Sequence, residues 1–155
     1  MSNDLIVQAL EPVLKRLATL PIADVASARV TLETEFPLTG ALGAKLKELS
    51  ERGLKEGWLC NREGGGSKFS RVAKPEKAQG FSIDAVLLSG DGPWHKHTKG
   101  EVNICLNWGG VPKFCGHAPG WAVFSPGSEH VPSVSGGSML IFYLLPDGAM
   151  EWKKT

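Results

Sequence analysis

The second half of the chain limits the fold most. From Phe81 onward, short apolar runs alternate with turns of Gly, Pro, Asp and Ser; the runs are FSIDAVLLSG, EVNICLNW, GWAVFSPG and SMLIFYLLPDG. No segment of helical spacing longer than two turns interrupts them. Closely spaced short strands are typical of a β-sandwich or a small β-barrel. We therefore expect a mainly β protein.

The first half of the chain has a different pattern. Apolar residues recur at helical spacing in residues 4–20, and Pro12 is expected to bend or divide that helix. A second helical pattern lies near residues 39–56, with Gly57 as a plausible stop. Residues 57–75 are typical of a β-hairpin whose turn is Gly64-Gly65-Gly66.

The length of 155 residues favours one compact unit. Within it, we expect residues 1–75 to form an N-terminal helical segment and a hairpin packed on a barrel. Residues 76–155 are expected to form the barrel itself, with the boundary near Lys74-Pro75-Glu76-Lys77.

Composition narrows the classes of partner and location. Lys and Arg number 17 against 16 Asp and Glu, so no charge excess indicates nucleic acid or an anionic membrane as a partner. The three cysteines form no C-x-x-C pair, which argues against a disulfide framework and a cysteine-rich zinc site. The N-terminus lacks a basic region before an apolar run, and no run is long enough to span a membrane. A cytoplasmic protein is expected.

Three histidines and one glutamate form a candidate metal site. His95 and His97 lie at positions i and i+2, so an extended strand would present both imidazoles on one face. A turn through Gly100 could return Glu101 to that face, and His130 follows another turn. Imidazoles with one carboxylate suit a divalent ion such as zinc, iron, manganese, nickel or copper. His117 stands apart and is expected in a loop.

These residues resemble the two motifs of the cupin superfamily, G(X)5HXH(X)3–4E(X)6G and G(X)5PXGXXH(X)3N. Three residues separate His97 from Glu101, and Gly127 and His130 fit the second motif. The chain departs from the pattern at Ser125, where proline is usual, and at Val134, where asparagine is usual. The resemblance implies a cupin-type β-barrel (jelly-roll) with these metal ligands: His95, His97, Glu101 and His130.

A closer resemblance covers most of the chain. The N-terminal helical segment, PWHKHTKGEVNICLNW, GWAVFSPGSEHVPSVSGG and LIFYLLPDGAMEW are similar to the 4-hydroxylaminobenzoate lyase family. That resemblance implies a metal-dependent lyase of nitroaromatic degradation, which converts 4-hydroxylaminobenzoate to 3,4-dihydroxybenzoate and ammonia. Substrate plus one water balances product plus ammonia, so the reaction needs no external oxidant, flavin or nicotinamide. The metal would act as a Lewis acid.

Other residues are candidates around the metal. Alternation after Glu101 places Asn103, Cys105 and Asn107 on the ligand side and Val102, Ile104 and Leu106 on the other. Asn103 is a candidate catalytic group, and Tyr143 could offer a phenol inside the barrel. The expected substrate is a small aromatic carboxylate, and the sequence leaves open which basic residue would bind it: Lys68, Arg71, Lys99 or Lys113. Trp94 and Trp121 could form the walls of an aromatic pocket or pack in the core.

The sequence also leaves open two other functions and the oligomeric state. The same ligands could serve a different cupin enzyme, such as a dioxygenase or an isomerase. Residues 39–74 also have the order of a winged-helix unit, but residues 39–57 carry four basic and three acidic side chains and lack a clear basic face. The apolar face of residues 102–106 could pack within the chain or against another subunit, which leaves a homodimer open.

Overall fold

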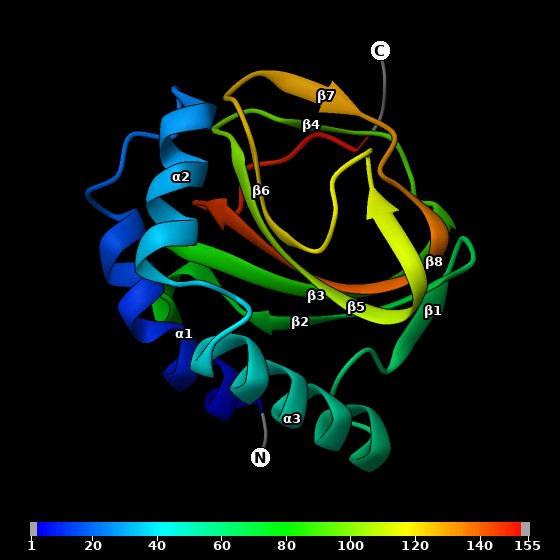
Figure 1. The fold of residues 1–155 in the computed structure, drawn as a ribbon. Helices are drawn as coiled ribbons and strands as arrows, with labels where there is room; N and C mark the ends of the chain where they lie inside the picture. Colours follow the sequence, from blue (N-terminus) through cyan, green and yellow to red (C-terminus); the bar gives the residue numbers. More distant parts are fainter. Residues whose placement is uncertain (1–2, 153–155) are drawn as a thin grey trace.

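The computed structural model describes residues 3–152 and is mainly antiparallel β with three helices near the N-terminus (Figure 1). The first two residues of the predicted segment 1–75 and the last three of 76–155 lie outside this description. The elements are α1 (Asn3–Leu17), α2 (Val25–Glu35), α3 (Ala41–Glu56), β1 (Arg62–Gly64), β2 (Ser67–Ala73), η1 (Pro75–Lys77), β3 (Phe81–Asp91), β4 (His95–His97), β5 (Glu101–Phe114), β6 (Gly120–Phe124), β7 (Ser128–His130) and β8 (Ser133–Pro146). The predicted fold class is confirmed.

Helix α1 is continuous and ends three residues earlier than the sequence predicted. Its apolar stripe is buried, at Ile6, Leu10, Val13, Leu14 and Leu17. The expected division at Pro12 is wrong, since Pro12 lies inside the helix. Proline removes the N–H that would bond the carbonyl of Gln8, but both residues are exposed, so water can satisfy that carbonyl.

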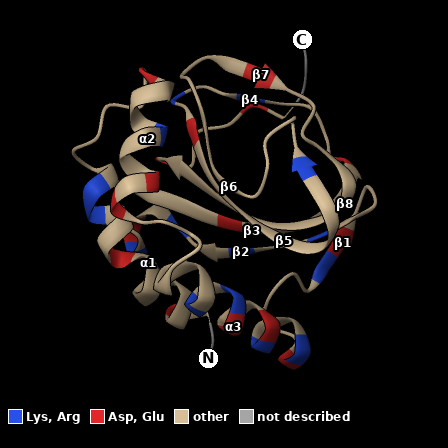
Figure 2. Ribbon diagram, viewed as in Figure 1, with Lys and Arg blue, Asp and Glu red and all other residues tan. Residues whose placement is uncertain are grey.

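Helix α2 was not predicted. Asp24 caps its start by accepting a hydrogen bond from the Ser27 amide at 3.2 Å. Only Ala28 and Leu32 are buried, so the helix has no broad apolar stripe to reveal it in the sequence. Helix α3 follows the predicted range, and Gly57 caps it with a left-handed φ of 87°. Basic side chains and glutamates are intermixed along α3 (Figure 2).

The main sheet has six strands in the order β1-β2-β3-β8-β5-β6. The predicted hairpin is present: β1 and β2 pair antiparallel, and the turn between them uses Gly65 and Gly66 at φ 59° and 83°. β2 is in turn hydrogen-bonded to β3. The hairpin therefore extends the same sheet, and the expected boundary near residue 75 lies between two neighbouring strands.

A second, two-stranded sheet pairs β4 with β7 and lies across the top of the molecule in Figure 1. The C-terminal segment runs beside it. Lys96 and Glu151 exchange two backbone hydrogen bonds, of 2.9 and 3.0 Å.

The six-stranded sheet has a different core on each face. The helices pack on the face that contains Val102, Ile104 and Leu106. Cys105 and Tyr143 belong to the core cluster of the opposite face. The predicted alternation is thus confirmed up to Cys105, whereas Asn107 is exposed beside a register shift of β5. No helix within residues 3–152 is long and apolar enough to cross a membrane.

Candidate metal centre and adjoining cleft

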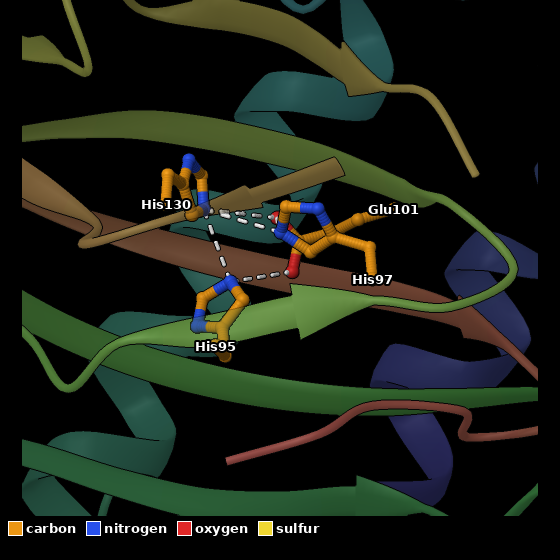
Figure 3. A group of neighbouring side chains, drawn as sticks. All are labelled: His95, His97, Glu101 and His130. Carbon is orange, nitrogen blue, oxygen red and sulfur yellow. Dashed lines mark hydrogen bonds and ion pairs between the residues drawn. The ribbon is translucent and has the colours of Figure 1, made fainter. Parts of the chain in front are cut away.

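The structure brings together the four side chains that the sequence singled out, His95, His97, Glu101 and His130 (Figure 3). The Nε2 atom of His130 lies 3.0 Å from that of His95 and 3.2 Å from that of His97. Glu101 Oε1 lies 3.4 Å from His95 Nε2, and Glu101 Oε2 lies 3.2 Å from His97 Nε2. Four ligand atoms therefore converge within 4.8 Å of one another.

Local backbone geometry explains this convergence. Strand alternation turns His95 and His97 of β4 to the same face, and the register of the small sheet sets His130 opposite His95. The chain then turns at Gly100, whose φ is 93°, and enters β5 at Glu101. The positive φ at Gly100 favours glycine, and a Cβ there would lie 2.7 Å from Ile22 Cδ1 and 3.2 Å from the Phe124 carbonyl oxygen, so these neighbours would have to shift.

The electrostatics of the cluster favour a bound cation. Burial by itself would raise the pKa of Glu101, but the adjacent His95 and His97 imidazoles lower it to about 2. Burial, together with the neighbouring histidines, lowers the pKa of His130 to about 4. At neutral pH the cluster therefore offers a carboxylate and a neutral imidazole, which are the states that bind metal ions.

Neighbouring side chains orient two of the four candidate ligands. The hydroxyl of Ser128 donates its proton to the Ser125 carbonyl at 2.6 Å, so at 2.9 Å it accepts a hydrogen bond from Nδ1 of His97. This places the imidazole proton on Nδ1 and leaves the Nε2 lone pair facing the cluster. Asn103 donates from Nδ2 to Glu101 Oε2 at 2.8 Å. Ser128 is not among the residues predicted from the sequence, although it lies at i−2 from His130 on the same strand.

Cys115 lies beside Nδ1 of His130, the ring nitrogen that does not face the other candidate ligands. Its sulfur is 3.6 Å from His130 Nδ1. Burial raises the pKa of this thiol, so it is protonated at neutral pH. His117, which the sequence predicted to stand apart, is not a member of the cluster.

The two candidate catalytic residues lie on the same face of the main sheet. Tyr143 of β8 stands directly opposite Asn103 of β5, and both are buried. The Tyr143 ring centroid is 6.0 Å from that of His95. Burial raises the pKa of Tyr143 well above its usual value, so the phenol keeps its proton.

A cleft of about 820 Å³ extends from His95 and Tyr143 to the outer strands β1 and β2. Its apolar walls include Phe69, Met150 and Trp152. The ring centroid of Trp152 lies 5.7 Å from that of His95. This volume is typical of a site for a small organic ligand.

The aromatic wall differs from the one considered in the sequence. Trp121 is buried in the core under α2, where its Nε1 donates to the Phe36 carbonyl at 2.8 Å, and Trp94 does not line the cleft. Trp152 takes that place because the C-terminal segment runs beside β4. Only this long-range pairing brings residue 152 to the site, and no local pattern signals it.

Of the four basic candidates for the substrate carboxylate, Arg71 alone lines the cleft. Lys99 pairs with Asp147 at 2.6 Å. Arg62, which was not among the residues predicted from the sequence, also lines the cleft.

The family model and the named relatives agree on one family. The family model described as "PnbB: 4-hydroxylaminobenzoate lyase" matches residues 8–152. A protein of Nocardioides sp. (strain LMS-CY) named 4-hydroxylaminobenzoate lyase is 35% identical over 120 residues, covering 69% of this chain and 70% of that protein. A Pseudomonas putida protein of the same name is 29% identical over 127 residues, covering 70% and 72%. A solved RmlC-like cupin protein of Ralstonia eutropha JMP134 is 15% identical, with a TM-score of 0.45 over 59% of this chain and 62% of that one.

Proposed function

Since the chain belongs to the 4-hydroxylaminobenzoate lyase family, we propose that it is a metal-dependent lyase of aromatic hydroxylamines. The proposed reaction converts 4-hydroxylaminobenzoate, or a close analogue, with one water to 3,4-dihydroxybenzoate and ammonia. The observation that carries the proposal is the cluster of three histidines and a glutamate beside a cleft with aromatic walls.

The stoichiometry fits a site of this kind. The N–O and C–N bonds break and the nitrogen leaves as ammonia, while the ring carbon that held it and the adjacent carbon each end with a hydroxyl group, so electrons are redistributed within one molecule. The reaction therefore consumes no oxidant or reductant. A site for this chemistry has to bind the ring, polarise the N–O group and supply water.

The donor set suits a divalent ion. Ligands bound to one ion at about 2.0–2.2 Å lie roughly 3–3.5 Å apart, and the two Nε2–Nε2 separations of 3.0 and 3.2 Å fall in that range. A mixed set of nitrogen and oxygen donors is compatible with Zn, Fe, Mn or Ni. The proposed ligands are His95, His97, Glu101 and His130. When bound, the ion would supply Lewis acidity and lower the pKa of water.

The other side chains have distinct proposed roles. Glu101 is a poor general base because it is a ligand and its pKa is about 2. Asn103 holds the Glu101 carboxylate through its amide hydrogen bond. Tyr143 keeps its phenolic proton, so it can donate a hydrogen bond to an oxygen or nitrogen of the substrate. The apolar walls at Met150 and Trp152 would shield the reacting groups from bulk water.

The test is turnover of 4-hydroxylaminobenzoate in oxygen-18 water without oxygen. We expect ammonia and a catechol that carries the label. A product formed only in air would contradict the lyase reaction and indicate an oxygenase with the same ligands. Metal analysis of protein purified without a histidine tag, with a His97→Ala variant as its comparison, identifies the ion and tests whether it binds at this cluster.

A further inference from the structure

The end of the cleft away from the metal cluster contains a charged pair. Arg71 of β2 donates from Nε to Asp84 Oδ1 at 2.5 Å. Both side chains line the cleft. Because the pair uses Nε, the guanidinium is held in one orientation, and its two terminal nitrogens remain as a fork of donors. Within residues 3–152 those terminal nitrogens make no side-chain hydrogen bond.

Arg71 is connected to the proposed metal centre by a row of polar residues across the sheet. Arg71 stands opposite Asp84, Asp84 opposite Tyr143, and Tyr143 opposite Asn103. Neighbouring strands are about 4.8 Å apart, so Asp84 and Asn103 are separated by roughly 10 Å. That span accommodates a benzene ring with substituents at opposite ends.

The chemistry of this end suits a carboxylate. Arg62 of β1 adds a second positive charge, with its guanidinium carbon 6.0 Å from the centroid of Phe69. The acidic side chains of the cleft are Asp84, which is already paired with Arg71, and Asp91. A planar arginine fork binds a carboxylate through two parallel hydrogen bonds, which gives both strength and orientation.

We propose that Arg71, held by Asp84, binds the carboxylate of a para-substituted benzoate and directs the opposite substituent to the metal centre. This inference rests on the proposed function for its substrate class. Arg71 is a binding residue here, and Asp84 is a positioning residue. The row of side chains then sets specificity: it selects aromatic acids whose reacting group lies para to the carboxylate.

Calorimetric titration with 4-hydroxybenzoate and 4-hydroxybenzamide tests the inference without turnover. The unaltered protein should prefer the carboxylate. Arg71→Met should weaken 4-hydroxybenzoate binding about ten- to a hundredfold, the range expected for hydrogen bonds to a charged group, and should leave amide binding nearly unchanged. Arg71→Lys should retain part of the preference.

Two further variants separate specific binding from other effects. Lys68→Met removes a positive charge from the same strand at an exposed position outside the cleft lining, and it should bind like the unaltered protein. Arg71→Met with Asp84→Asn avoids leaving Asp84 unpaired, and it should show the same loss as Arg71→Met. The inference is overturned if Arg71→Met keeps the preference for the carboxylate, or if Lys68→Met loses it equally.

The binding experiment and the turnover experiment can fail separately. A protein that selects the carboxylate through Arg71 but releases no ammonia from 4-hydroxylaminobenzoate would contradict the proposed function. It would still support Arg71 as the residue that binds the carboxylate. If the protein releases ammonia and Arg71→Met has an unchanged KM, the proposed function is supported. The role of Arg71 in binding the carboxylate is then contradicted.

Discussion

Replacing Ser128 with alanine tests how the metal ligands are held. Ser128 would act on the proposed ion through the His97 ring: its hydroxyl accepts from His97 Nδ1 at 2.9 Å and donates to the Ser125 carbonyl at 2.6 Å. His97 is fully buried, so no bulk water can replace the lost acceptor. The Ser128→Ala variant would leave a buried N–H unpaired or let the proton move to Nε2, where it would block the metal.

The expected loss of metal affinity can be estimated in two ways. An unpaired buried donor costs about 1–3 kcal/mol. Loss of a partner that orients a metal ligand lowers affinity about 10–100-fold, which corresponds to roughly 1.4–2.8 kcal/mol. The two ranges agree. We therefore expect Ser128→Ala to bind Zn²⁺ about 10–100-fold more weakly than the unaltered protein.

Competition with a chelator in the untagged protein measures that affinity, and circular dichroism checks the fold. Ser125→Ala is the matched control, because it removes a hydroxyl from the turn just before β7 and keeps the main-chain carbonyl that Ser128 uses. Ser128→Thr retains a hydroxyl and should recover most of the affinity. Unchanged Zn²⁺ binding by a folded Ser128→Ala protein would refute the reasoning, as would an equal loss in Ser125→Ala.

Two more substitutions test the site and the fold. Asn103→Ala removes the hydrogen bond to Glu101 and should lower kcat about 10–100-fold; because both residues are fully buried, it should also lower the free energy of unfolding by about 1–3 kcal/mol, and an unaltered kcat in the folded variant would exclude a role for this amide. Leu10→Ala opens a cavity under α1, where Leu10 is fully buried, and should cost about 2–5 kcal/mol. For a domain of this size that is roughly 4–20 °C in Tm by calorimetry. The exposed neighbour Glu11→Ala should leave Tm nearly unchanged, and equal losses in both would contradict the packing of α1.

The positions that the sequence predicted well depend on local rules. His95 and His97 share a face because strand geometry has a period of two. The same rule sets Asn103 beside Glu101 and turns Val102 toward the helices. Gly57 ends α3 because a left-handed cap needs little more than a glycine after an apolar helix.

The positions that the sequence missed depend on long-range pairing. Helix α2 has only two buried side chains, so its hydrophobic periodicity is too weak to detect. Arg71 could not be chosen from four basic candidates, because its place in the cleft follows from the register of β2 with β3. Trp152 lies near His95 only because the segment at Glu151 pairs with Lys96, more than fifty residues earlier in the chain.

The distribution of the proposed ligands over two sheets explains why the C-terminal segment matters to the site. Three imidazoles come from the small β4–β7 sheet, and the carboxylate comes from β5 of the main sheet. A two-stranded sheet has little stability of its own, so the position of its histidines relative to Glu101 depends on what holds it. The backbone bonds between Lys96 and Glu151 are one such restraint, and Trp152 follows directly after them in the wall of the cleft. One short segment thus fixes the strand that carries two proposed ligands and shapes the space beside them. The position of Trp152 is therefore tied, through the pairing of Glu151 with Lys96, to the strand that carries His95 and His97.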